Sequence, residues 1–165
     1  MKKLMGVVTF GGCFAFMASV ALASAWQANG GACIPTDKTV LDNAWWVVTG
    51  GGRVKHKGSS LADIRLVCPV SQLSRSASTL RLYYQDTDGA GTQLQITAYV
   101  RQFHKTTGGF STPCAIWSQQ AGGWRFIDNP ACGFIDLDSH LIWIEVLIHR
   151  ETTSGLVEFN GVELR

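Results

Sequence analysis

The stretch that decides the fold class of this chain is TLRLYYQ (79–85), and its pattern recurs in TQLQITAYVRQF (92–103). In both segments apolar and polar residues alternate, so an extended chain has one apolar and one polar face. A period of two over this length predicts two β-strands. The polar residues 86–91 between them contain glycine and predict that the two strands form a hairpin.

Three further segments carry strand signals. Residues 62–70 alternate in the same way and end near Pro69, which has no N–H to donate to a strand partner. The run LIWIEVLI (141–148) is apolar on both faces, which predicts a central strand covered on both sides. In residues 157–164 the apolar face changes parity at Asn160-Gly161. This change predicts one terminal strand with a bulge.

The whole pattern predicts an all-β fold. Glycine-rich breaks at 50–52, 108–109 and 122–123 separate the remaining short segments, with no repeat and no linker. About eight such strands predict a single-domain antiparallel β-sandwich, jelly-roll-like, that spans residues 26–165. The closing pattern of residues 157–164 is similar to the last strand of carbohydrate-binding jelly-rolls.

Residues 1–25 have the features of a cleaved secretory signal peptide. Lys2 and Lys3 precede an uncharged run from residue 4 to residue 23, and Ala23-Ser24-Ala25 fits a signal peptidase site. The alternative is a membrane anchor, since the run is almost long enough to span a bilayer. Glycines within the run and the lack of a following positive cluster favour cleavage. The mature protein is therefore expected to be secreted or periplasmic.

Charge narrows the classes of partner. The chain has 14 basic and 12 acidic residues, and removal of Lys2 and Lys3 leaves a net charge of zero. Nucleic acid binding and attachment to an anionic membrane both need a basic surplus, so neither is expected. A neutral glycan or an extracellular protein is the expected partner.

Four cysteines remain after the signal. They are Cys33, Cys68, Cys114 and Cys132. An even number in an exported chain predicts disulfides, and four cysteines allow three pairings. We favour Cys33–Cys68 with Cys114–Cys132, because each pair is nearest in sequence. A zinc site is the alternative, but no Cys-x-x-Cys pair is present.

Two carboxylates precede a glycine at Asp86, Asp88 and Gly89, which suggests the start of a calcium loop. However, Ala90 occupies the fifth position of that pattern, where an oxygen ligand is required. Asp and Gly are also good turn formers, and we favour a plain polar turn. No cofactor is expected, and Ca²⁺ at Asp86 and Asp88 is the less favoured alternative.

Six tryptophans suggest an aromatic binding surface. Indole rings stack on sugar rings when exposed, but they fill cores when buried. Trp45 and Trp46 are adjacent, so in a strand they face opposite sides and only one can enter the core. Trp124 follows two glycines and is expected to be exposed, whereas Trp143 is expected in the core. The candidate ligand-binding residues are therefore Trp124, Trp45 and Trp46.

Catalysis has weak support. No Gly-x-Ser-x-Gly motif is present, and a glycosidase needs two facing carboxylates, for which Glu145 and Glu158 are the candidates. The leading hypothesis is a secreted, non-catalytic module that binds a neutral glycan. The alternative is a structural or protein-interaction module of the cell envelope or an extracellular assembly. A glycoside hydrolase is third.

Overall fold

The fold was analysed in a computed structural model, which describes residues 26–36, 45–71, 77–88, 92–119, 121–133 and 135–165. The predicted signal (1–25) and residues Gly89 and Ala90 of the acidic turn lie outside this part of the chain. The elements are β1 (Trp26–Asn29), η1 (Gly30–Ala32), β2 (Ile34–Pro35), β3 (Trp46–Val48), β4 (Val54–His56), β5 (Ile64–Pro69), β6 (Leu80–Asp86), β7 (Leu94–His104), β8 (Phe110–Trp117), β9 (Ala121–Asn129), β10 (His140–Arg150) and β11 (Val157–Leu164).

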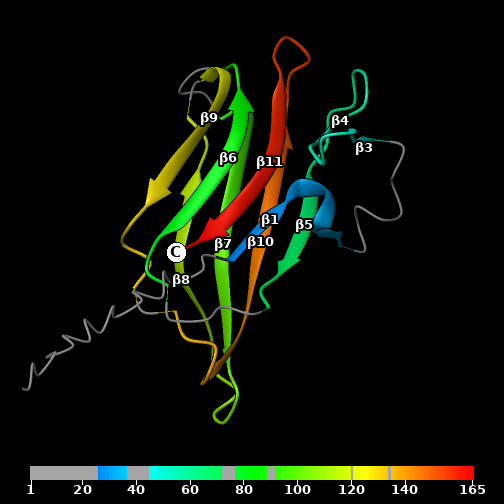
Figure 1. The fold of residues 1–165 in the computed structure, drawn as a ribbon. Coiled ribbons are helices and arrows are strands. Elements are labelled where there is room, and N and C mark those ends of the chain that lie inside the picture. The colour runs from blue at the N-terminus through cyan, green and yellow to red at the C-terminus, as the bar shows by residue number, and fades with distance from the viewer. Residues whose placement is uncertain (1–25, 37–44, 72–76, 89–91, 120, 134) are drawn as a thin grey trace, which may run out of the picture.

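These strands form two sheets packed face to face (Figure 1). The six-stranded sheet has the order β3-β4-β11-β6-β9, with β1 also paired to β11, and the five-stranded sheet has the order β2-β5-β10-β7-β8. All strand pairs are antiparallel. From β4 to β11 the chain alternates between the two sheets, except at the β7–β8 hairpin, as in a jelly roll. The predicted jelly-roll-like β-sandwich is confirmed.

Alternation correctly predicted which residues face inward, but not which strands pair. Leu80, Leu82 and Tyr84 of β6 are buried between the sheets, as are Leu94 and Ile96 of β7. The predicted hairpin is wrong, because β6 pairs with β11 and β9 whereas β7 pairs with β10 and β8. The chain crosses from one sheet to the other after β6. The apolar faces of β6 and β7 therefore belong to opposite layers of the same core.

Strand β10 is central in its sheet, as predicted, but it is covered on one side only. Ile142, Ile144, Val146 and Ile148 form its buried face. Leu141 on the other face is exposed, and Trp143 is only half-buried. The expectation that Trp143 lies in the core is therefore wrong. Its neighbours on the outer face are side chains of the same sheet, with no second layer above them in the described part of the chain.

The terminal strand bulges where the sequence predicted. The pairing of β11 with β6 shifts between Phe159 and Gly161. Gly161 pairs with Asn29 of β1, and a Cβ at position 161 would lie 2.5 Å from the carbonyl oxygen of Ala28. Glycine at the bulge thus lets β1 approach β11 closely.

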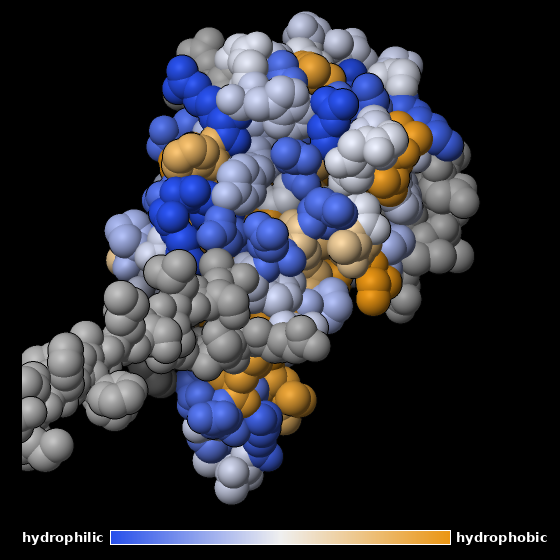
Figure 2. All heavy atoms as spheres, viewed as in Figure 1, coloured by the Kyte–Doolittle hydropathy of each residue, from blue (hydrophilic) through white to orange (hydrophobic). Residues whose placement is uncertain are grey.

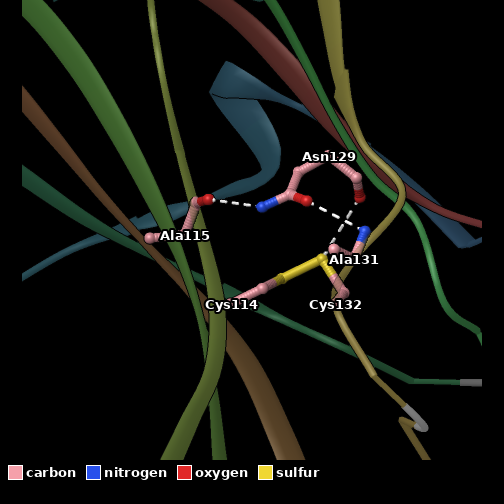
Figure 3. The surroundings of a disulfide bond; sticks show 5 residues. All are labelled: Cys114, Ala115, Asn129, Ala131 and Cys132. Carbon is pink, nitrogen blue, oxygen red and sulfur yellow. Dashed lines mark hydrogen bonds between the residues drawn. A yellow bond between two sulfur atoms is a disulfide. The ribbon is translucent and has the colours of Figure 1, made fainter.

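Both predicted disulfides are present, Cys33–Cys68 and Cys114–Cys132. The second joins β8 of one sheet to the segment that follows β9 of the other (Figure 3). Beside it, the side-chain amide of Asn129 donates a hydrogen bond to the Ala115 carbonyl at 2.8 Å and also links the two sheets. In the described residues, no helix is long and apolar enough to cross a membrane.

Candidate functional site

The outer face of the five-stranded sheet gathers aromatic side chains from three neighbouring strands. Alternation turns most of these residues away from the core, and a register shift between β7 and β8 brings Phe110 to the same face, opposite Phe103. The order β10-β7-β8 places them side by side. We call this surface the aromatic face. It consists of Tyr99 and Phe103 of β7, Phe110 and Trp117 of β8, and Trp143 of β10. Exposed fractions are 58% for Phe110 and 55% for Trp117, which is high for side chains of this size.

The strand register orders these rings along the sheet. Trp117 lies opposite Thr97 of β7, and Phe110 lies opposite Phe103. Thr97 and Phe103 are six residues apart on β7, which corresponds to roughly 20 Å. The rings therefore extend over a length suited to an elongated ligand. At one end of this row, the ring centroid of Phe110 lies 6.0 Å from the ring centroid of Trp143.

A charged pair stands in the middle of the aromatic face. The Arg101 guanidinium donates from Nε to Glu145 at 2.8 Å, and its Nη2 lies 2.7 Å from the same carboxylate oxygen. Arg65 approaches the other oxygen of Glu145 at 3.7 Å. The guanidinium also lies over the rings of Tyr99 and Phe110, at 4.6 and 5.7 Å from their centroids. The pair is therefore held in place and presents both hydrogen-bonding groups and balanced charge.

A second group of charges lies near the far end of the same sheet. The Nδ1 atom of His149 lies 2.6 Å from Asp63, and its Nε2 atom lies 3.1 Å from Glu151. Burial alone would lower the pKa of His149, but hydrogen bonds to both carboxylates raise it above its ordinary value. The group has two carboxylates for one imidazole, and Arg65, at 3.7 Å from Asp63, adds a second positive charge.

Next to Trp117 the surface is hollowed. The hollow has a volume of about 150 Å³ and lies between β8 and β9, with Gln119, Asp128 and Asn129 in its wall. Hydrogen bonding to Arg81 holds the pKa of Asp128 below its ordinary range, so this carboxylate is an acceptor at neutral pH. An exposed indole beside amide and carboxylate groups is the combination that orients sugar hydroxyls.

The opposite, six-stranded sheet has a different outer face. Figure 2 views the molecule as Figure 1 does, with this sheet in front, and shows mainly hydrophilic residues with separate apolar spots. Trp124 and Phe126 of β9 are exposed there, and each lies under an arginine. Arg53 is 5.0 Å from the Trp124 ring centroid, and Arg81 is 3.9 Å from that of Phe126.

The three tryptophans predicted as ligand-binding residues do not come together. Trp124 lies on β9 at one edge of the six-stranded sheet, whereas Trp45 and Trp46 lie at β3, its other edge. Trp124 and Trp45 are exposed, and Trp46 packs against the core, so the expected split of the adjacent pair is confirmed. Because Trp46 faces the core, the three do not form one platform, and Trp124 and Trp45 remain separate candidates.

The acidic pair Asp86 and Asp88 points into structure rather than solvent. Asp86 is the last residue of β6 and is buried, and its carboxylate accepts a hydrogen bond from the Ser118 hydroxyl. Asp88 accepts from the backbone N–H of Leu94 at 2.8 Å. Burial raises the pKa of Asp86 to about 6. Among the described residues, no group of three or more His, Cys, Asp or Glu side chains could hold a metal ion.

The nominated glycosidase pair is separated. Glu145 lies on the outer face of the five-stranded sheet, whereas Glu158 lies on the outer side of β11 in the six-stranded sheet. Glu158 contacts Lys55 at 3.2 Å and Arg53 at 3.5 Å. The two carboxylates face away from each other across the core and cannot flank one glycosidic bond.

Sequence reasoning missed most of the aromatic face. The outward position of Tyr99 followed from alternation, but Phe103, Phe110 and Trp117 were not nominated as ligand residues. Their shared signal is a large aromatic residue at an outward position of a strand. That signal identifies a surface only when the neighbouring strands are known.

No protein family and no curated protein matches this sequence. Several solved structures are similar to this chain at low identity. A xylan-binding module from Roseburia intestinalis matches with a TM-score of 0.44 and 11% identity, over 86% of this chain and 95% of that one. A family 11 carbohydrate-binding module from Clostridium thermocellum matches with a TM-score of 0.38 and 12% identity, over 85% of this chain and 86% of that one.

An enzyme is among the similar structures. A family two carbohydrate esterase from Cellvibrio japonicus matches with a TM-score of 0.44 and 8% identity, over 86% of this chain. The chain spans only 33% of the length of that esterase.

Proposed function

We propose that this protein is a non-catalytic binding module for a neutral glycan and that the glycan lies along the aromatic face. The carrying observation is the row of exposed and half-exposed rings from Trp117 to Phe110, with the Arg101–Glu145 pair between them. Aromatic rings offer flat apolar surfaces to the C–H faces of sugars, and the charged pair offers donors and acceptors to their hydroxyls.

Charge compensation supports a neutral ligand. Glu145 is paired with Arg101, and the carboxylates of Asp63 and Glu151 are opposed by His149 and Arg65. A long-range attraction for charged chains is therefore weak on this face. Selectivity would come from stacking and from hydrogen bonds at the centre and in the hollow next to Trp117.

The test is binding of soluble neutral polysaccharides, measured by affinity electrophoresis and calorimetry. Trp117→Ala removes an exposed ring, so it should leave the unfolding free energy nearly unchanged and weaken binding about tenfold or more. Trp124→Ala is the matched control, because it removes an equally large exposed ring from the opposite sheet. It should keep full binding.

The reverse pattern would contradict the proposed site. If Trp124→Ala loses the glycan and Trp117→Ala does not, the binding surface is on the six-stranded sheet. If no neutral polysaccharide is retained on a broad glycan array, the glycan function itself fails.

A structural or protein-interaction module is the second candidate. Phe103, Phe110 and Leu141 are all exposed and meet where β7, β8 and β10 are paired. Figure 2 shows apolar residues gathered at the protruding lower end of the molecule, where the β7–β8 hairpin lies in Figure 1. Leu141→Ser should abolish any concentration-dependent self-association seen by light scattering, and it should leave glycan binding intact because Leu141 is not part of the aromatic face.

The proposal includes export with cleavage after residue 25. Two disulfides are typical of proteins in oxidising compartments. Intact-mass analysis of the exported protein should give a chain that starts near Trp26. Recovery of uncleaved protein from a membrane fraction would contradict this part of the proposal.

A further inference from the structure

A cavity of about 400 Å³ opens at one end of the sandwich, away from the aromatic face. It lies where β10 runs toward β11 and β4 passes alongside, in the upper part of Figure 1. Lys55, His56, Lys57 and Arg150 contribute its polar wall, and Leu156 and Val157 are among its apolar lining. No acidic residue lines it in the described part of the chain.

Arg150 enters this cavity through strand alternation. The even-numbered residues of β10 face the core from Ile142 to Ile148, and Arg150 continues that face at the end of the strand. The residue is 9% exposed. A guanidinium with so little access to water needs strong compensation from partners.

The partners of Arg150 are neutral. Its Nε donates to the Thr152 carbonyl at 3.0 Å, and its Nη1 donates to the carbonyls of Gly58 and Ser60 at 2.8 and 3.3 Å. Among the described residues it forms no salt bridge, and its Nη2 forms no hydrogen bond. The buried charge is thus oriented by three carbonyl dipoles but is not neutralised by a carboxylate.

The surroundings add positive charge. Lys55 and Lys57 line the same cavity. The carboxylates of the neighbouring strands have other cationic partners, since Glu158 contacts Lys55 and Arg53, and Asp63 contacts His149. His56 donates from Nε2 to the Ala62 carbonyl at 2.7 Å, and burial lowers its pKa, so it is neutral near pH 7 and oriented by that bond.

We propose that this cavity binds a carboxylate group, with Arg150 Nη2 as the principal donor and the lysines as supporting charges. Nε and Nη1 are occupied by carbonyls, which leaves the N–H groups of Nη2 to donate charge-assisted hydrogen bonds to a carboxylate. The volume and the apolar wall suit a carboxylate carried on a body the size of one sugar ring. Two sources share this chemistry, a uronic acid sugar and a small free carboxylate.

The test compares glucuronate, acetate and glucose as ligands of the whole protein in thermal shift and calorimetry. Glucuronate should bind and raise the melting temperature, because a ligand bound only by the native state stabilises it. Glucose should have no effect. Equal effects of acetate and glucuronate would assign the site to free carboxylates, and an effect of glucuronate alone would assign it to the sugar acid.

Variants identify the cavity. Arg150→Gln should abolish the glucuronate effect, and Lys57→Gln, at an exposed position, should weaken it about tenfold without affecting folding. Arg125→Gln removes an exposed cation on β9 and is the matched control, which should behave as wild type. Trp117→Ala should also bind glucuronate normally. Failure of the neutral-glycan proposal can therefore be distinguished from failure of the carboxylate site.

Two results would overturn the proposal. One is the absence of a glucuronate and an acetate effect in the wild type. The other is a glucuronate effect that persists in both Arg150→Gln and Lys57→Gln. Lys57→Gln keeps the proposal testable even if Arg150→Gln does not fold.

Discussion

At the scale of single residues, Trp45 and Trp46 show how strand geometry gives two identical side chains different roles. Their side chains point to opposite sides, so Trp46 packs against the core while Trp45 remains exposed. The chemistry of the indole is the same in both. Only position relative to the second sheet determines whether the ring stabilises the fold or is available to a ligand.

This difference is measurable by unfolding in urea. Trp46→Ala should lower the unfolding free energy by about 3 kcal/mol, because it removes apolar surface from the core. Trp45→Ala at the neighbouring position is its control and should cost under about 1 kcal/mol. Equal costs for both changes would contradict the split.

Asp86 provides a second prediction at this scale. Its pKa is about 6 in the folded protein, where burial opposes ionisation, and about 4 in an unfolded chain. Between these values the folded protein keeps a proton that the unfolded chain has lost, so stability falls as pH rises through this range. Asp86→Asn should remove this pH-dependent loss of stability, because asparagine does not ionise. The stability of the variant relative to wild type should rise by about 2–3 kcal/mol between pH 4 and pH 8.

Asp128 is the control with the opposite sign. Hydrogen bonding to Arg81 lowers its pKa in the folded protein, so this carboxylate adds stability that is lost as pH falls through its folded-state pKa. Asp128→Asn should therefore become less stable relative to wild type as pH rises. Equal slopes for the two variants would refute the assignment of Asp86 as the group destabilised by burial.

At the scale of elements, the bulge in β11 connects the two neighbours of that strand. On one side β11 pairs with β6, and on the other it pairs first with β4 and then with β1. Gly161 stands where β1 approaches. The bulge thus allows the short strand β1, which follows the predicted cleavage site, to pair with β11 in the six-stranded sheet.

Gly161→Ala tests this account. The added Cβ would lie 2.5 Å from the Ala28 carbonyl oxygen, a backbone atom that cannot move alone. The change should destabilise the protein by about 2 kcal/mol and increase amide exchange in β1. Gly122→Ala is the control, because a Cβ there meets nothing within 4 Å. A neutral Gly161→Ala would show that β1 is not held closely against the bulge.

At the scale of the whole molecule, the disulfides close the two halves of the chain separately. Cys33–Cys68 fastens the N-terminal segment to β5, and Cys114–Cys132 joins the two sheets at the β8–β9 edge. The sequence separations are 35 and 18 residues. Because each bridge restricts the unfolded chain, the longer loop is expected to stabilise slightly more.

Removal of each bridge by paired Cys→Ala substitutions should cost about 4 kcal/mol for Cys33–Cys68 and about 3 kcal/mol for Cys114–Cys132. Denaturant unfolding measures both values. A reducing agent should lower the melting temperature of the wild type. It should not change the melting temperature of a variant that lacks both disulfides. A wild type insensitive to reduction would contradict the structural role of the disulfides.

The sequence by itself determined the local features. The inward faces of β6 and β7, the bulge at Gly161, the central position of β10 and the pairing of the cysteines could all be predicted, because side-chain alternation and loop length are properties of the chain near each residue. The split between Trp45 and Trp46 followed from the same alternation.

Only the tertiary structure decided which strands are neighbours. Backbone hydrogen bonds form equally well between any two extended strands, so alternation could not show that β6 and β7 lie in different sheets. Strand order brings Trp117, Tyr99 and Phe110 onto one face, and it places Trp124 and Glu158 on the other. It also joins Arg150 with Lys55 and Lys57, which are far from it in sequence. The candidate sites depend on these long-range contacts, and the sequence pattern alone could not locate them.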